Sequence, residues 1–165
     1  MEVQATGRDR RLTGRLGVVA VFMGTHEHSL DAKGRLILPR KFRDELGQDM
    51  VITKGIEPCL YGFPLAEFES FAAKLRTLPL TQRPGRDFVR VFVSGASQET
   101  VDTQGRVLIP PPLREYANLS KDVLVVGQLS RIEIWDRGQW AAYMDRAQAA
   151  YSDESNAAYL AELGI

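Results

Sequence analysis

The strongest constraint on the fold is an internal repeat. The segment Asp31–Pro39, with the sequence DAKGRLILP, returns 71 positions later as Asp102–Pro110, with the sequence DTQGRVLIP. The similarity continues between residues 51–71 and 123–143 after one inserted residue. A duplicated unit is the simplest explanation, and each copy is too short to bury much of a core alone. We therefore expect the two copies to build one body together.

Each copy predicts the same order of elements: two strands, a short helix, two more strands and a longer helix. The Asp-x-x-Gly-Arg motif after the first strand predicts a hairpin turn, because aspartate accepts hydrogen bonds from nearby amides and glycine can take a positive φ. The residues expected to shape the turns are Asp31 and Gly34 in one copy, and Asp102 and Gly105 in the other. A proline after the next strand suits the first position of a helix.

These elements predict an α+β fold. The expected strands are 25–30, 36–38, 50–54, 59–63, 97–101, 107–109, 123–127 and 131–135. The expected helices are 40–46, 65–75, 82–93, 111–117 and 139–150. The first repeat then covers residues 23–75, a connecting segment covers residues 76–95, and the second repeat covers residues 96–150.

The two ends of the chain lie outside the repeats. Residues 1–22 carry four arginines against two acidic residues, which predicts a flexible basic extension. Two interpretations of it stay open: a tail that contacts phosphates, or a leader upstream of a start at Met23. Residues 151–165 contain three acidic residues and no lysine or arginine, so this acidic tail cannot help to hold DNA. We expect it to be mobile or to face a partner.

Composition excludes several classes of protein. Cys59 is the only cysteine, so an intramolecular disulfide and a cysteine-pair zinc site are both excluded, which fits a reducing compartment. The longest apolar stretch near the start, residues 17–24, is far shorter than the roughly 18 residues that a membrane helix needs. We expect a cytoplasmic protein without a membrane span.

No pattern in the chain indicates an enzyme. The glycine-rich nucleotide loops and the Gly-x-Ser-x-Gly elbow are absent from the sequence. His26 and His28, the only histidines, share one face of a strand, and with Asp31 nearby they could bind a metal. We favour the alternative of two polar strand residues, and expect no cofactor and no metal.

Several motifs together resemble the MraZ family of transcriptional regulators, which are encoded with bacterial division and cell-wall genes. They are Met23-Gly24-Thr25, the paired Asp-x-x-Gly-Arg turns, and the stretch from Val126 to Trp135. The resemblance covers about residues 22 to 150, and its motifs are specific because they come as a spaced pair.

This resemblance implies two tandem halves similar to AbrB and SpoVT domains, whose interleaved hairpins form a swapped-hairpin β-barrel. It also implies a sequence-specific DNA-binding regulator that acts as a ring-shaped homo-oligomer, commonly an octamer. The expected targets are repeated promoter boxes of the division and cell-wall gene cluster, including its own operon, in double-stranded DNA of the nucleoid. The alternative is an oligomeric structural or interaction module without specific DNA readout.

Charge alone does not indicate a DNA-binding protein, because 21 basic residues balance 21 acidic ones and any nucleic-acid surface must be local. Residues 31–46 carry five cations against three acids, whereas residues 102–117 carry two against two. The second copy has Gln104 in place of a lysine, and two prolines in place of Arg40 and Lys41. We therefore expect the first repeat to face DNA and the second to be mainly scaffold.

The candidate DNA contacts are Arg35, Lys33, Arg40, Lys41 and Arg43, with Arg106 as a weaker candidate. The family resemblance also points to the arginine of the first motif. Its planar donor fork can hold a phosphate or the major-groove edge of guanine. The three helix residues of this set have a second interpretation as a solvated surface. Asp31 and Asp102 are expected to pair with the arginine four positions later and so stabilise each turn.

A second basic group lies between the repeats. Its members are Arg76, Arg83, Arg86 and Arg90, offset only by Asp87. We favour a surface helix face that pairs with acidic neighbours in another subunit.

Overall fold

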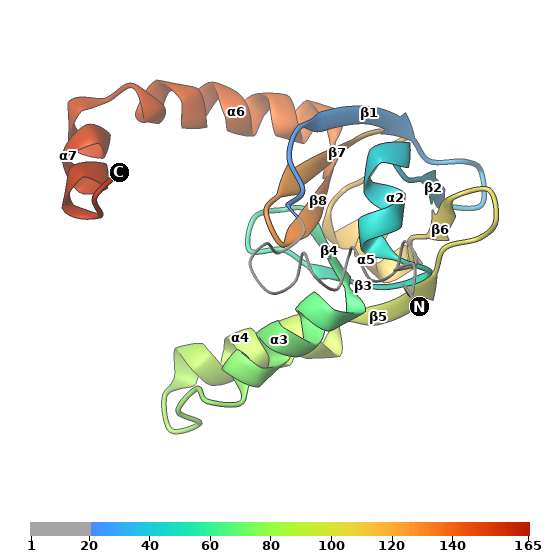
Figure 1. Ribbon diagram of the computed structural model, residues 1–165, viewed down its shortest axis with the longest axis horizontal. Helices are drawn as coiled ribbons and strands as arrows, with labels where there is room; N and C mark the ends of the chain where they lie inside the picture. Colours follow the sequence, from blue (N-terminus) through green and yellow to red (C-terminus); the bar gives the residue numbers. More distant parts are fainter. Residues whose placement is uncertain (1–20) are drawn as a thin grey trace, which may run out of the picture.

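Strands from the two repeats exchange partners in the protein, whose computed structural model describes residues 21–165 (Figure 1). Six strands form one antiparallel sheet in the order β1-β7-β8-β4-β3-β5, and β2 pairs with β6 as a separate ribbon. The strands are β1 (Thr25–Ser29), β2 (Arg35–Ile37), β3 (Asp49–Lys54), β4 (Leu60–Pro64), β5 (Ser97–Thr100), β6 (Arg106–Leu108), β7 (Asp122–Gln128) and β8 (Arg131–Asp136). The helices are α2 (Arg40–Leu46), α3 (Leu65–Leu75), α4 (Arg83–Ser94), α5 (Pro111–Tyr116), α6 (Arg137–Tyr151) and α7 (Glu154–Glu162).

The strand pairing is symmetric about the middle of the large sheet. Strand β1 of the first repeat pairs with β7 of the second, and β5 of the second pairs with β3 of the first. The ribbon likewise takes β2 from one repeat and β6 from the other. Each repeat therefore satisfies backbone hydrogen bonds of the other, which confirms that the two copies build one body.

Both Asp-x-x-Gly-Arg motifs form the predicted reversing turns, each closed by a hydrogen bond from the aspartate amide to the arginine carbonyl at 2.9 Å, but the strand pairing expected beside each turn is very short. Strands β1 and β2 meet only at a single antiparallel bridge between Leu30 and Leu36. The second strand of each turn crosses to the opposite repeat instead, because its inward residue, Leu36 or Val107, is fully buried in the shared core. The large sheet ends at β1 and β5, and the strand pairs within residues 21–165 do not close into a ring.

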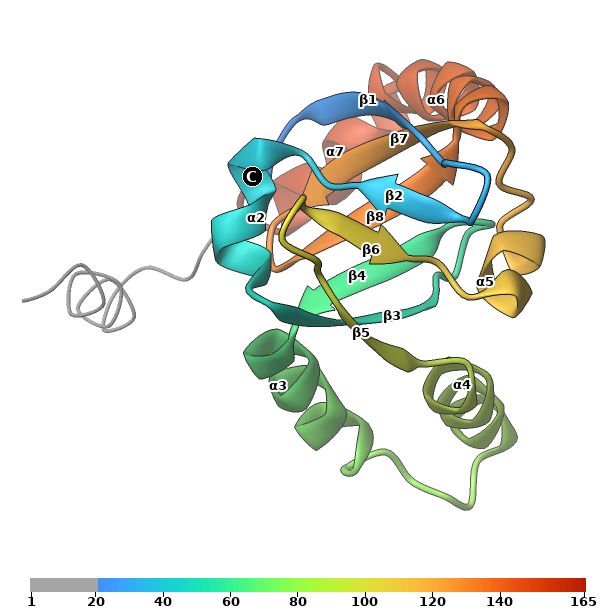
Figure 2. The same cartoon turned by 90° about the vertical axis from the view of Figure 1, so that its right-hand side faces the viewer.

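The main core lies between the large sheet, the ribbon, α2 and α5 (Figure 2). Both repeats contribute to it in matched positions. Helix α2 inserts Phe42 and Leu46, and α5 inserts Leu113 with Ala117 directly after it. Full burial of each large side chain contributes about 1.5–3 kcal/mol. This core fixes the ribbon against the sheet from the inside and leaves the outer side of the ribbon free.

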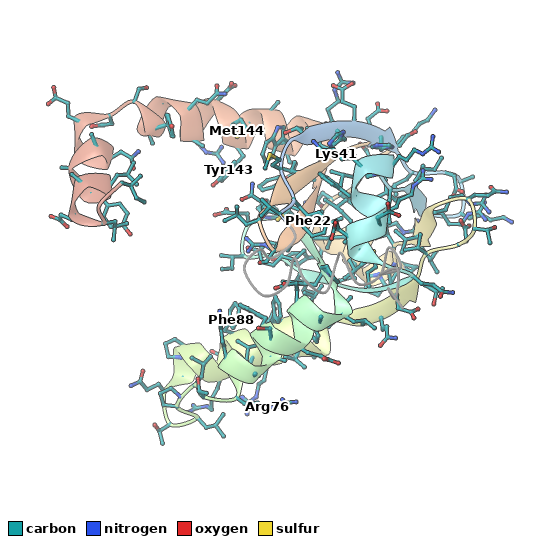
Figure 3. The ribbon with its side chains drawn as sticks, viewed as in Figure 1. Phe22, Lys41, Arg76, Phe88, Tyr143 and Met144 are labelled. Atoms are coloured by element: carbon teal, nitrogen blue, oxygen red, sulfur yellow. The ribbon has the colours of Figure 1, made fainter. Side chains whose placement is uncertain are left out.

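The opposite face of the sheet is covered by α3, α4 and α6, which pack on aromatic side chains (Figure 3). Phe63 of β4 contacts Phe71 of α3 and Phe92 of α4 at centroid distances of 5.9 and 6.2 Å. In the second repeat, Trp135 contacts Tyr143 of α6 at 5.0 Å. The long helices therefore lie on the side of the sheet away from the ribbon.

All five expected helices are present, with differences at the ends of three of them. Pro39 and Pro110 are the caps that precede α2 and α5 rather than their first residues. Helix α6 begins two residues earlier than expected, because the Asp136 carboxylate accepts hydrogen bonds from the amides of its first turn. The acidic tail, expected to be mobile or partner-facing, forms α7, and Asp153 caps it in the same way. None of the helices within residues 21–165 is both long and apolar enough to cross a membrane.

The folded body includes Phe22, which was expected to belong to the basic extension of residues 1–22. Phe22 is 1% exposed, and its backbone exchanges two hydrogen bonds with Leu129 at 2.7 and 2.9 Å. Its ring packs edge-on against Phe42 at 5.4 Å. Phe22 is therefore part of the core. The rest of the expected basic extension, residues 1–20, lies outside the described residues.

Candidate nucleic-acid interface

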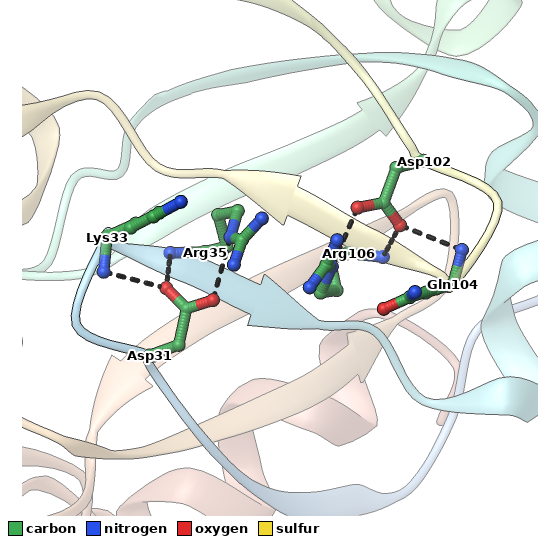
Figure 4. A network of polar contacts seen from close by, with 6 residues as sticks. All are labelled: Asp31, Lys33, Arg35, Asp102, Gln104 and Arg106. Atoms are coloured by element: carbon green, nitrogen blue, oxygen red, sulfur yellow. Dashed lines mark hydrogen bonds and ion pairs between the residues drawn. The ribbon is translucent and has the colours of Figure 1, made fainter.

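The two turns share one hydrogen-bond geometry (Figure 4). In the first, Asp31 Oδ1 accepts from the backbone amides of Lys33 and Arg35, both at 2.9 Å. Gly34, at φ +77°, donates its amide to the Asp31 carbonyl at 3.0 Å. Each of these contacts recurs around Asp102 in the second turn. The four turn-shaping residues predicted from the sequence thus occupy the expected positions.

Each aspartate also holds the arginine of its motif. Arg35 Nε donates to Asp31 Oδ2 at 2.7 Å, and Arg106 Nε donates to Asp102 Oδ2 at the same distance. Hydrogen bonds from the backbone amide and then the guanidinium of the arginine lower the pKa of both aspartates, so each stays ionised at neutral pH. The predicted turn-stabilising pairs are confirmed. Within residues 21–165 neither arginine uses its terminal Nη groups in a hydrogen bond.

Each turn glycine is covered by an arginine from the opposite repeat. The guanidinium of Arg114, on α5, lies against Gly34, and that of Arg43, on α2, lies against Gly105. A Cβ at either glycine would overlap this guanidinium. Arg43 Nε also donates to the Leu38 carbonyl at 3.0 Å. Arg43, a candidate DNA contact from the sequence, is therefore half-buried against the second turn, and its packing alone accounts for its position.

The outer face of the ribbon brings the two motif arginines together. In the register of β2 and β6, Arg35 lies opposite Leu108 and Ile37 lies opposite Arg106. Successive side chains of a strand alternate between its faces, and the intervening Leu36 is fully buried. Ile37 and Leu108 are 46% and 43% exposed. On the outer face, two arginines thus alternate with two aliphatic residues, both along each strand and across the ribbon.

The exchange of strands separates the cations of the first repeat. Lys33 lies in the turn beside α5, whereas Arg40 and Lys41 begin α2, which lies beside the turn that carries Gln104 (Figure 2). All three cations are exposed. Cations of the first repeat therefore lie beside the turns of both repeats. The structure places one cation near one end of the ribbon, two near the other, and Arg35 and Arg106 between them.

The second basic group lies away from the ribbon, on and near α4 (Figure 2). Arg83 pairs with Asp87 at 3.4 Å, and Arg86 donates to the Leu80 carbonyl at 2.8 Å. Some of its charge is thus used within α4 and the loop before it. The structure does not bring this group into the candidate DNA surface.

The two histidines face inward from β1. The His26 ring packs edge-on against Phe42 at 4.9 Å. Burial lowers the pKa of His28, and the neighbouring His26 and Arg43 lower it further. Within residues 21–165 no three histidine, cysteine, aspartate or glutamate side chains gather as a metal site would require. Their surroundings fit the interpretation as polar strand residues packed beside the core.

Sequence reasoning missed three residues of this region: Arg114, Ile37 and Leu108. The repeat itself contained a signal for each. Arg114 stands at the repeat position of Arg43, and both copies carry an arginine followed two positions later by an aliphatic residue. The alternation of a strand places these two on one face, but it does not reveal which face is buried.

Comparison with known proteins agrees with this duplicated architecture. A family model described as MraZ protein, antitoxin-like, matches the chain twice, over residues 21–91 and 92–161. A protein of Kineococcus radiotolerans named transcriptional regulator MraZ is 52% identical over 130 residues, which cover 79% of this chain and 91% of the relative. Proteins with the same name from Frankia casuarinae and Acetivibrio thermocellus are 53% and 50% identical, over 76% and 74% of this chain and 87% and 86% of their own lengths. The chain therefore belongs to the MraZ family, as its motifs indicated.

Proposed function

We propose that the protein is a sequence-specific DNA-binding transcriptional regulator, and that the outer face of the ribbon is its DNA-contacting surface. The names of its relatives support the first part. One observation carries the second: Arg35 and Arg106 are both fixed through Nε on a single exposed face, with their terminal donors unused within residues 21–165.

The dimensions and chemistry of the ribbon suit the major groove. A strand of three residues is about 10 Å long, and the major groove, about 12 Å wide, admits a two-stranded ribbon. The terminal donors of an arginine match the O6 and N7 acceptors of guanine, or a phosphate. Lys33 near one end, and Arg40 and Lys41 near the other, are placed to meet the phosphate backbones that flank the groove. This local arrangement compensates for the zero net charge of the chain.

A single ribbon would bind weakly, so the proposed function includes self-association. We propose a ring-shaped homo-oligomer, such as an octamer, that presents several ribbons to repeated promoter boxes. Linked sites can strengthen binding by roughly two to four powers of ten without new contacts. The proposed targets are the division and cell-wall gene cluster and the protein's own operon, with the protein cytoplasmic and associated with the nucleoid. In each subunit of this oligomer, the sheet and the ribbon would act as one barrel-like body.

The surfaces proposed for self-association are α4 and the arm formed by α6 and α7. In Figure 1 this arm projects from the sheet, and α7 lies at a steep angle to α6 at its end. Tyr159 of α7 and Leu163, which caps its C-terminal end, are both exposed and about one turn apart. The segment of α7 is acidic, whereas the region of α4 has a surplus of arginine, so the two surfaces are complementary in charge.

A binding titration tests the proposed function. The probe is duplex DNA from upstream of the protein's own gene, at two salt concentrations, and the variant is Arg35→Ala with Arg106→Ala. The control, Lys74→Ala, removes a positive charge from exposed α3, away from the ribbon and from the surfaces proposed for self-association. We expect the ribbon variant to lose specific binding with an unchanged oligomer mass by light scattering. The control should retain it. Wild-type affinity should fall with salt at a slope of about −2 to −3 for each docked ribbon that contacts two or three phosphates.

The same titration separates the alternative function. An oligomeric interaction module without DNA readout would assemble normally and bind promoter and scrambled DNA equally. That result for the wild type, or normal promoter binding by the ribbon variant, would overturn the proposal.

A further inference from the structure

The outer face of the ribbon carries two exposed aliphatic side chains that folding does not explain. Ile37 and Leu108 leave nearly half of their surface in water, while their strand neighbours Leu36 and Val107 are fully buried. Isolated exposed aliphatic residues are common on protein surfaces. These two differ because they occupy the same position of each repeat. They also share one face with Arg35 and Arg106, whose Nε atoms are held by aspartates.

The register places each aliphatic residue beside an arginine in two directions. Ile37 lies opposite Arg106 and two positions after Arg35, and Leu108 has the mirrored pair of neighbours. Side chains directly opposite each other are about 5 Å apart at Cβ, and residues two apart on a strand are separated by about 6.6 Å. Successive base pairs are separated by about 3.4 Å. Each aliphatic group therefore lies within one to two base-pair steps of the base that the neighbouring arginine reaches.

The major groove offers one apolar group to such a side chain. Thymine carries a C5 methyl there, whereas cytosine, adenine and guanine present hydrogen-bonding groups. A polar residue at these positions would hydrogen-bond to several bases, but an aliphatic one gains only from a methyl group that it can cover. Ile37 and Leu108 are thus suited to select thymine and to disfavour cytosine, which presents a polar amino group instead.

We propose that Ile37 and Leu108 are specificity-determining residues that read thymine methyl groups within two base pairs of the guanines held by Arg35 and Arg106. This inference rests on the proposed function, because it needs the ribbon to enter the major groove. It assigns different tasks to the two arginines and to the two aliphatic residues of the outer face. The arginines supply most of the affinity, and the aliphatic pair supplies part of the choice of sequence.

The test uses DNA that differs from the preferred site only in methyl groups. Duplexes selected from a random-sequence pool by the wild-type protein are compared with the same duplexes in which deoxyuridine replaces thymidine. The proteins are the wild type, Ile37→Ser, Leu108→Ser and a matched control, Leu80→Ser, whose exposed side chain lies in the loop between α3 and α4 (Figure 2). The substitutions remove exposed side chains, and thermal melting checks that each variant folds.

Loss of each contacted methyl should weaken wild-type binding about four-fold, by analogy with one buried methylene. Ile37→Ser and Leu108→Ser should each bind the thymidine duplex more weakly and lose sensitivity to uracil at the base that they contact. Leu80→Ser should behave as the wild type does. Equal wild-type affinity for both duplexes would overturn this inference and leave the proposed function intact. Failure of the wild type to select any duplex would overturn the proposed function and this inference with it.

Discussion

The two Asp-x-x-Gly-Arg turns have the same backbone and the same aspartate–arginine pair, here called the clamp. The side chains around this common part differ. Both turns fix an arginine through a carboxylate at 2.7 Å. Around this common part, Lys33 is matched by Gln104, and the two cations at the start of α2 are matched by prolines at the start of α5. The exchange of strands brings the α2 cations to the turn that lacks a lysine. The comparison shows that charge counted along each repeat does not predict charge at each end of the ribbon.

The largest expected effect on stability comes from the glycine of each turn. Gly34→Ala and Gly105→Ala each place a side chain at φ +77° and against a guanidinium, which together should cost about 2–3 kcal/mol of unfolding free energy. Gly105→Ala should cost more, because Arg43 is also held by the Leu38 carbonyl. Urea unfolding measures both. Adding Arg43→Ala to Gly105→Ala should relieve the overlap between the new Cβ and the guanidinium, but not the backbone strain. A loss of unfolding free energy below about 0.5 kcal/mol for either glycine variant would contradict this packing.

The clamp itself is expected to affect specificity equally in both turns. Asp31→Asn and Asp102→Asn remove the ionised acceptor of the arginine Nε. The arginine side chain is then less fixed in the free protein and must lose conformational freedom when it binds DNA. We expect the ratio of affinities for promoter and scrambled DNA to fall about 2- to 10-fold for each variant. Affinity for scrambled DNA should rise slightly, because a negative charge is lost. An unchanged ratio would show that the clamp only shapes the turn.

The charge difference between the turns can be reversed. Gln104→Lys adds a cation beside the two already present at the start of α2, and Lys33→Gln removes the one at the other turn. Each change should alter the salt slope by about one unit per docked ribbon, steeper for the added lysine and shallower for the lost one. Titrations at several salt concentrations measure it. A slope that responds to only one of the two would mean that DNA covers only one end of the ribbon.

The smallest expected difference concerns pH. The inner positions of β1 carry His26 and His28, whereas the equivalent positions of β5 carry Ser97 and Glu99. The pKa of His28 is lowered from its ordinary 6.5, so the unfolded chain binds more protons just below pH 6.5 and stability should decline as the pH falls through that window. Asp31 and Asp102, whose pKa values are lowered from 3.8, remain ionised there.

Urea unfolding at pH 7.5 and 5.5 measures this decline, which should be shallower for His28→Gln. An identical decline in wild type and variant would exclude His28 as its cause.

The local structure of the repeats could be predicted from the sequence because turn chemistry and periodicity are local. The Asp-x-x-Gly-Arg turns and the helices Arg40–Leu46 and Leu65–Leu75 were predicted as the structure has them. The family was also indicated, because the motif occurs twice at a set spacing.

Strand partners were not predictable in the same way. Nothing in the residues around Leu36 states whether the strand returns along its own repeat or crosses to the other, since its buried side suits either partner. Consequently the pairing of β2 with β6 was not predicted from the residues, and Arg106 was given a weaker place among the candidate DNA contacts than Arg35. The burial of Phe22 was missed for a related reason, because its partner Leu129 lies in the second repeat.

One measurement tests the central claim most directly, that both repeats contribute equivalent arginines to one DNA-binding ribbon. Arg35→Ala and Arg106→Ala are compared singly with the wild type for binding to the same promoter duplex, at one salt concentration and with oligomer mass monitored. The account predicts similar losses, roughly 5- to 150-fold for each ribbon that loses a guanine contact. Wild-type binding by Arg106→Ala beside a large loss for Arg35→Ala would contradict it and restore a division into a binding repeat and a scaffold repeat.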